Sequence, residues 1–223
     1  MPADLVTTVL ATFVGLFPIV NPFSTAAVFL GITANLSDAE RRRQARLACV
    51  YATGVLLVFL FGGALIMSFF GISIPALRVA GGLIVARVGF GMLSPAERGA
   101  GGEGASARAD VAFTPLAVPM LSGPGSIAVT IGMAAGAHTL VEYAAIAVGI
   151  AAVIAASYAV LASARAVKRH LGEQGIDAMT RIMGFLLVCI GVQFIGIGVI
   201  DVATDPRLVG AIADALARHR AVP

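Results

Sequence analysis

Long apolar stretches recur along the chain and predict membrane-spanning helices. Five of these stretches carry no charge: Leu5–Ala34, Leu47–Phe70, Phe113–Ala137, Tyr143–Ala164 and Ile182–Ile200. A sixth, Gly71–Leu93, is interrupted only by Arg78 and Arg87. Each is close to the ~20 apolar residues that a helix needs to cross the hydrocarbon core of a bilayer. None shows the polar stripe that a soluble helix would present to water. The pattern therefore predicts an all-α membrane protein with six transmembrane helices.

Two of the stretches contain helix-breaking residues near their middles. The first reads "FPIVNPFSTAAV" over Phe17–Val28, and the fourth reads "VPMLSGPGSIAV" over Val118–Val129. Proline removes a backbone donor and clashes with the preceding helical turn. In lipid, the freed carbonyl must find another partner or face a water-filled cavity. We therefore expect helices 1 and 4 to be broken near mid-depth, around a polar site; two simple kinks without a site are the alternative.

The two halves of the chain resemble each other. With one inserted residue, Pro18 aligns with Pro119 and Ser24 with Ser126, and "LRVAGGLIV" (Leu77–Val85) aligns with "TRIMGFLLV" (Thr180–Val188). Each half has three spans, an odd number, so the second must be inverted relative to the first. We expect one membrane domain, 1–223, with repeat 1 at 1–93, a flexible cytoplasmic loop at 94–112, repeat 2 at 113–201 and a short extracytoplasmic tail at 202–223.

Basic residues are distributed unequally between the loops. The first, third and fifth loops hold Arg41, Arg42, Arg43, Arg46, Arg98, Arg108, Arg165, Lys168 and Arg169, whereas the other side has only Arg207, Arg218 and Arg220. The positive-inside rule places the first group in the cytoplasm. The chain is thus predicted to be a multi-pass inner-membrane protein with both termini extracytoplasmic. Beside a span, the "RRRQAR" run indicates a topology anchor, and no nucleic-acid partner is expected.

The broken helices define the candidate site. Helix N-termini offer N–H groups to an anion, and helix C-termini offer carbonyls to a cation, so a zwitterion such as a small amino acid could use both. Inverted repeats with interrupted helices are typical of secondary transporters. The candidate substrate-binding residues are Asn21, Pro22, Phe23, Ser24, Thr25, Ser122, Gly123, Pro124, Gly125 and Ser126. A membrane scaffold and a channel remain alternatives.

Other ionisable residues give weaker indications. Arg78 and Arg181 each open a span and are either interfacial anchors or gating, charge-paired groups. No Asp or Glu falls within a predicted hydrocarbon core, so Ser122 and Ser126 lack a general base, and an enzyme is not expected. We expect no cofactor and no metal, and consider sodium or a proton as a possible coupling ion. The "GMAAG" spacing of Gly132–Gly136 allows close packing within a subunit or in a homo-oligomer.

Four motifs carry a family resemblance: "LFPIVNPFSTAAVFLGIT", "LRVAGGLIV", "TPLAVPMLSGPGSIAVTI" and "TRIMGFLLVCIGVQFIGIGV". They resemble the MarC family of bacterial and archaeal integral membrane proteins, in order through almost the whole chain. The resemblance implies six spans and, for some relatives, transport of small neutral amino acids such as glycine or alanine. The matching motif residues are Asn21, Pro22, Arg78, Gly123, Pro124, Gly125 and Arg181. Arg87 departs from the family pattern, which is usually apolar there.

Overall fold

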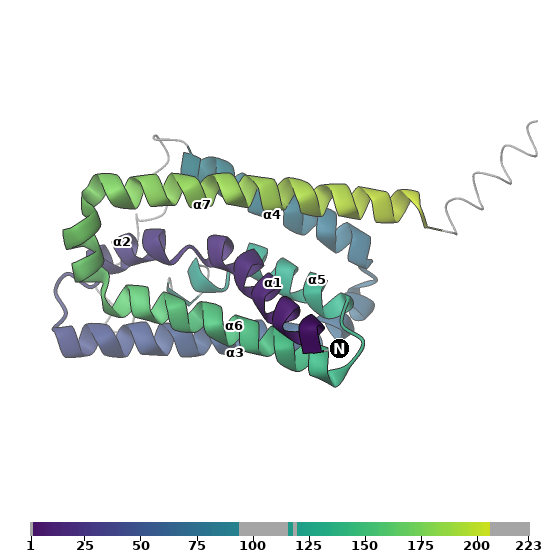
Figure 1. The fold of residues 1–223 in the computed structure, drawn as a ribbon, viewed down its shortest axis with the longest axis horizontal. Helices are drawn as coiled ribbons and strands as arrows, with labels where there is room; N and C mark the ends of the chain where they lie inside the picture. Colours follow the sequence, from purple (N-terminus) through teal and green to yellow (C-terminus); the bar gives the residue numbers. More distant parts are fainter. Residues whose placement is uncertain (1, 94–115, 118–119, 206–223) are drawn as a thin grey trace, which may run out of the picture.

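The computed structural model describes residues 2–93, 116–117 and 120–205. Seven helices form the described part: α1 (Pro2–Val20), α2 (Pro22–Ile32), α3 (Asp38–Phe70), α4 (Ile74–Leu93), α5 (Pro124–Ala135), α6 (Leu140–Ala162) and α7 (Ala164–Ala203). Short π-helical turns at 116–117 and 120–121 precede α5, and no strand occurs in these ranges. Most of the helices run lengthwise in one elongated bundle (Figure 1). The all-α prediction is confirmed.

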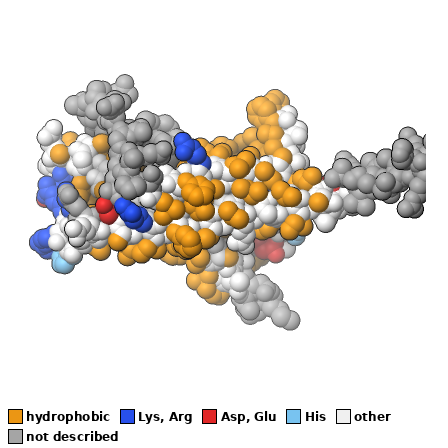
Figure 2. Space-filling model, turned by 90° about the horizontal axis from the view of Figure 1, so that it is seen from above, with side chains coloured by type: hydrophobic (Ala, Val, Ile, Leu, Met, Phe, Trp, Pro, Cys, Tyr) orange, Lys and Arg blue, Asp and Glu red, His pale blue; other side chains and the backbone are white. Residues whose placement is uncertain are grey.

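Four of these helices are long and apolar enough to cross a membrane: α3, α4, α6 and the Gln174–Ala203 part of α7. A fifth candidate is the pair α1 and α2, which is bent by 41° at Asn21. The remaining predicted span, Phe113–Ala137, is described only in part, and its α5 is 12 residues long. Hydrophobic side chains cover much of the lateral surface of the bundle, while Lys and Arg gather near one end (Figure 2). This surface suits a bilayer, whose interior solvates apolar side chains.

Local sequence signals mark several of the helix ends. Ser37 and Glu40 form a reciprocal capping box at the start of α3, and Thr139 and Glu142 form another at the start of α6. Such boxes satisfy two of the N–H groups that a helix start leaves without partners. Gly71 ends α3 in the left-handed conformation, with φ 65°, which glycine adopts without a Cβ clash. The α3–α4 connection is therefore a tight turn.

The most extensive helix–helix contact of the described part joins α4 and α7, which lie side by side in Figure 1. Glycines allow the two backbones to touch. A Cβ on Gly82 would lie 2.6 Å from the Gly191 carbonyl oxygen, and one on Gly89 would lie 2.7 Å from the Gly184 carbonyl oxygen. Without a hydrophobic effect between helices in lipid, such close packing is a main source of association. These glycines set the separation of the two helices.

The two short helices that follow the breaks, α2 and α5, each pack on two longer helices. The helix after the first break, α2, packs on α6 and α7, and the helix after the second break, α5, packs on α3 and α4. In Figure 1, α2 extends toward one end of the bundle and α5 toward the opposite end. The helices that follow the two breaks therefore extend toward opposite ends of the bundle.

One arginine of the "RRRQAR" run has a structural role. The Arg41 guanidinium is buried and donates hydrogen bonds to the Thr33 hydroxyl at 3.0 Å and the Thr33 carbonyl at 2.8 Å, at the end of α2. It also pairs with Asp38 at 2.9 Å. Charge-assisted bonds of this kind satisfy helix-end carbonyls. Arg41 thus fastens the end of α2 to the start of α3.

The structure describes only some of the segments that the sequence predicts between and after the two repeats. The loop at 94–112 lies outside the described residues, as does the tail beyond Asp205. The fifth loop is more structured than expected, because α7 begins at Ala164, directly after α6, and turns sharply at Gly172, where φ is 65°. The long apolar part of α7 follows that turn.

The α4–α7 contact predicts opposite effects of alanine at two glycines of α7. Gly191→Ala should destabilise the protein by about 1–3 kcal/mol, because its Cβ would lie 2.6 Å from the Ala86 nitrogen and overpack the interface. Gly196→Ala is the matched control: no atom lies within 4 Å of its Cβ, and alanine stabilises a helix interior by roughly 0.5–1 kcal/mol. Thermal unfolding in detergent compares the two variants, and equal midpoints would contradict close packing at Gly191.

Candidate functional site

Asn21 forms the break between α1 and α2. Its backbone has φ 41° and ψ 69°, and it is the one described non-glycine residue with positive φ. Asparagine tolerates this left-handed conformation better than most residues. Pro22 then opens α2 at its first position, where a missing N–H costs nothing. The sequence "NP" thus stops one helix and starts the next with a single residue between them.

The polar backbone groups at this break find partners within the protein. The Ser24 N–H, which would continue the helix by bonding the Val20 carbonyl, instead donates to the Asn21 side-chain oxygen at 3.4 Å. The Val20 carbonyl accepts from the Thr25 hydroxyl, also at 3.4 Å. In a medium without water, an unsatisfied group would cost several kcal/mol. Asn21 and Thr25 therefore stabilise the break itself.

The second break, before α5, is built differently. Gly123 precedes α5 in an extended conformation and gives the helix no side-chain cap, and Pro124 occupies the first helical position. Just upstream, both the N–H and the hydroxyl of Ser122 donate to the Ala117 carbonyl, at 2.9 and 2.8 Å. The N–H groups of the first helical turn have no intrahelical acceptors. The N–H groups at the start of α5 can therefore bind an anion. At the start of α2 the Asn21 side chain already accepts from the Ser24 N–H, so that end is less available to an anion.

The two breaks line one cavity of about 320 Å³. Asn21, Ser24 and Thr25 contribute from the first break, and Gly123, Pro124, Gly125 and Ser126 contribute from the second. Within the part of the chain that the structure describes, no charged side chain lines it. The hydroxyls of Ser24 and Ser126 make no hydrogen bond within the described residues and so can donate or accept. The site can hold a small polar solute by neutral groups and helix-end dipoles.

The apolar walls of the cavity were not predicted from the sequence. They come mainly from α4 and from Leu187 of α7; the α4 residues are Ile84, Val85, Val88 and Met92. Ile19, Val20 and Met120 complete the lining. A Cβ on Gly125 would lie 3.0 Å from Val85 Cγ2 and 3.3 Å from Ile19 Cγ2. Apolar periodicity alone does not tell which face of a hydrophobic helix meets a cavity and which meets lipid.

Three predicted residues do not line the cavity. Pro22 is buried at the start of α2, and Ser122 is buried with its hydroxyl bonded to Ala117. Phe23, also a candidate substrate-binding residue, packs edge-on against Phe17, with ring centroids 6.3 Å apart. Val85 and its neighbours line the cavity instead.

The two arginines at span starts differ from each other. Arg78 forms an ion pair with Asp201, which joins the start of α4 to the end of α7. Arg181 is exposed and makes no ion pair within the described residues. Neither lines the cavity. Arg78 is therefore a charge-paired residue. The exposure of Arg181 is consistent with a position at the membrane interface.

The sequence of the chain is similar to a named family over nearly its full length. It matches the family described as MarC family integral membrane protein over residues 6–203. Inner membrane proteins named MarC from Citrobacter koseri and Salmonella typhimurium are each 42% identical over 202 residues, covering 84% of this chain and 91% of the relative. One from Escherichia coli is 41% identical over the same length.

The chain belongs to the MarC family. This confirms the resemblance drawn from the four motifs. The names of the relatives agree with the apolar helices in indicating an inner-membrane protein. No solved structure matches the chain significantly. The interpretation of the cavity rests on the contacts described above.

The geometry at Asn21 predicts different costs for two substitutions. Asn21→Ala should lower the free energy of unfolding by about 1–3 kcal/mol, because alanine cannot cap Ser24 and disfavours positive φ. Asn21→Gly should cost only a few tenths of a kcal/mol, since glycine accepts this conformation. Thermal unfolding in detergent measures both. Equal losses in the two variants would show that backbone conformation at residue 21 does not limit stability.

Proposed function

We propose that this protein is a secondary transporter of a small neutral amino acid, such as glycine or alanine, working by alternating access around the broken helices. One observation carries the proposal: Asn21 and Gly123, 102 residues apart in the sequence, line the same cavity. Broken helices that meet at a central site are the usual design of a solute-binding site in such carriers. A kink without function gives no reason for both breaks to face one space.

The chemistry of the lining suits a small zwitterion. The N–H groups at the start of α5 can bind a carboxylate, as helix N-termini bind anions. The hydroxyls of Ser24 and Ser126 and the Asn21 side chain can accept hydrogen bonds from an ammonium group. Because no charged side chain among the described residues lines the cavity, a ligand without net charge avoids leaving a buried charge unpaired. Val85 and Ile19, close to Gly125, favour a small side chain on the ligand.

Contacts in the bundle support an architecture of six spans in two inverted repeats. Gly82 and Gly184 are 102 residues apart, and so are Gly89 and Gly191. The observed contacts pair Gly82 with Gly191 and Gly89 with Gly184, so each contact is the image of the other when the halves are exchanged. The packing of α2 on α6 and α7 has its image in that of α5 on α3 and α4. A two-fold axis that relates the two repeats would produce both of these pairs of equivalent contacts.

The ion pair Arg78–Asp201 fits a gating role in this scheme. It joins a helix of repeat 1 to a helix of repeat 2 at one end of the bundle, and both side chains are partly exposed. Opening that end would separate the two charges. Asp201 is also a titratable group that a proton-coupled cycle could use, whereas the hydroxyls of the two breaks suit sodium. The proposed transport cycle is compatible with coupling to either a proton or sodium.

Widening and narrowing the cavity tests the proposal directly. In proteoliposomes, the wild type should show glycine counterflow, in which unlabelled glycine inside drives uptake of labelled glycine. Gly125→Ala should reduce this flux by roughly tenfold, because its Cβ would lie 3.0 Å from Val85 Cγ2. Val85→Ala in the same chain should restore much of the flux by removing the obstructing methyl groups. Wild-type flux in Gly125→Ala would place the path elsewhere.

The counterflow assay also separates the alternative functions. A carrier exchanges labelled for unlabelled solute, a channel shows flux that follows the gradient without exchange stimulation, and a scaffold shows neither. Gly54→Ala is the matched control, since no atom lies within 4 Å of its Cβ. Absence of counterflow with a panel of small amino acids in well-folded protein would reject the carrier proposal.

The orientation proposal, with both termini extracytoplasmic, has its own test. In a chain with Cys49 and Cys189 replaced by alanine, single cysteines at Ala39 and His170 should be protected from an impermeant maleimide in intact cells. Single cysteines at Ala76 and His138 should react. All four positions are exposed, so accessibility reports the side of the membrane. The reverse labelling pattern would invert the proposed topology.

A further inference from the structure

A second cavity, of about 310 Å³, lies at the end of the bundle where α3 begins and α6 turns into α7. Its lining contains three arginines, Arg41, Arg42 and Arg165, and one acid, Asp38. The lining therefore carries a net charge of two positive units. The central cavity shares none of these residues. Neither the transport proposal nor the family gives this second cavity a role.

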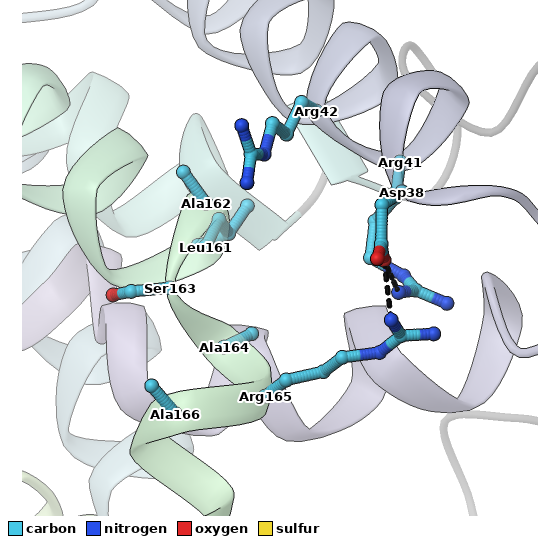
Figure 3. Close-up of a pocket in the computed structure, with 9 residues that line it drawn as sticks. All are labelled: Asp38, Arg41, Arg42, Leu161, Ala162, Ser163, Ala164, Arg165 and Ala166. Atoms are coloured by element: carbon cyan, nitrogen blue, oxygen red, sulfur yellow. Dashed lines mark hydrogen bonds and ion pairs between the residues drawn. The ribbon is translucent and has the colours of Figure 1, made fainter.

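The charged groups in this cavity are paired incompletely. Asp38 accepts from both Arg41 and Arg165, so one carboxylate serves two guanidinium groups. Arg42 is exposed and makes no ion pair within the described residues. Figure 3 shows Arg42 reaching over the α6–α7 turn while Arg165 reaches from α7 to Asp38. Both arginines line the cavity, and guanidinium groups bind phosphate well.

The surface next to the cavity indicates where the anion comes from. Exposed apolar residues of α6 recur every three or four positions and form one face: Val141, Ala144, Val148, Ala151, Ala155 and Ala159. This face leads directly to exposed Ser163 at the α6–α7 turn, which lines the cavity. A free phosphate would have no use for such a face. A phospholipid could lay an acyl chain along this face and place its phosphate in the arginine-lined cavity.

We propose that this cavity binds the phosphate group of an anionic phospholipid, such as phosphatidylglycerol, in the leaflet on the basic side of the bundle. Basic pockets between membrane helices bind anionic headgroups in this way. The Asp38–Arg165 pair is highly exposed, so its disruption by a competing phosphate costs little. Arg41 stays fixed on Thr33 and supplies a permanent positive charge.

Native mass spectrometry of the detergent-purified full chain tests the proposal with phosphatidylglycerol and phosphatidylcholine as probes. The wild type should retain phosphatidylglycerol preferentially. The double variant Arg42→Gln, Arg165→Gln should lower the apparent affinity for phosphatidylglycerol by roughly ten- to thirtyfold. Arg43→Gln with Arg169→Gln is the matched control, because it removes the same charge from exposed neighbours that do not line the cavity.

A gain-of-binding variant excludes misfolding as the cause. Asp38→Asn removes the carboxylate that competes for Arg41 and Arg165, so it should raise the affinity for phosphatidylglycerol several-fold. Equal losses in the control pair and the cavity pair would overturn the proposal in favour of a diffuse charge effect. Displacement of the lipid by inorganic phosphate at equal concentration would show a free-anion site and overturn the lipid assignment. Transport can fail without affecting any of these measurements.

Discussion

The main constraint on this structure is that polar backbone groups have no water to bond within the hydrocarbon core. A helix can be interrupted there only if the interruption satisfies its own donors and acceptors. Asn21 meets this condition by capping Ser24, and Thr25 meets it by donating to the Val20 carbonyl. These two bonds satisfy backbone groups at the bend between α1 and α2, and the residues that make them, Asn21 and Thr25, also line the cavity. The geometry of the break is thus inseparable from its chemistry.

The breaks were predictable because their cause is local. Proline lacks an N–H, and the prolines of "NP" and "GPG" lie at the two interruptions, where Asn21 and Gly123 directly precede them. Pro18, by contrast, lies inside α1 without ending it. The walls of the cavity were not predictable, because they depend on how α4 and α7 are rotated about their axes. That rotation is fixed by glycines packing backbone to backbone, at Gly82 and Gly191 among others. In an almost uniformly apolar helix, composition does not distinguish the side that faces the cavity, which is why Val85 was not predicted from the sequence.

The basic run shows a similar limit. Composition predicts that "RRRQAR" anchors one end of a span, but successive residues on a helix point about 100° apart. Arg41 therefore turns inward to the Thr33 carbonyl, whereas Arg42 turns toward the α6–α7 junction and is exposed. Two consecutive arginines thus have different roles: Arg41 connects α2 to α3, and Arg42 lines the basic cavity. Only the rotation of α3, set by its buried face, distinguishes the two roles.

The α4–α7 pair constrains any motion that alternately exposes the central cavity. Its contacts fall at glycines seven residues apart, Gly82 and Gly89 on α4 and Gly184 and Gly191 on α7. Sliding one helix along the other would bring larger side chains against the opposing backbone, and packed interfaces of this kind resist gradual deformation. The pair also supplies Val85 and Leu187 to the cavity wall. A pivot at this pair would keep that wall in place. In the proposed alternating-access cycle, movement of α2, which packs on α7, and of α5, which packs on α4, would then change access to the cavity.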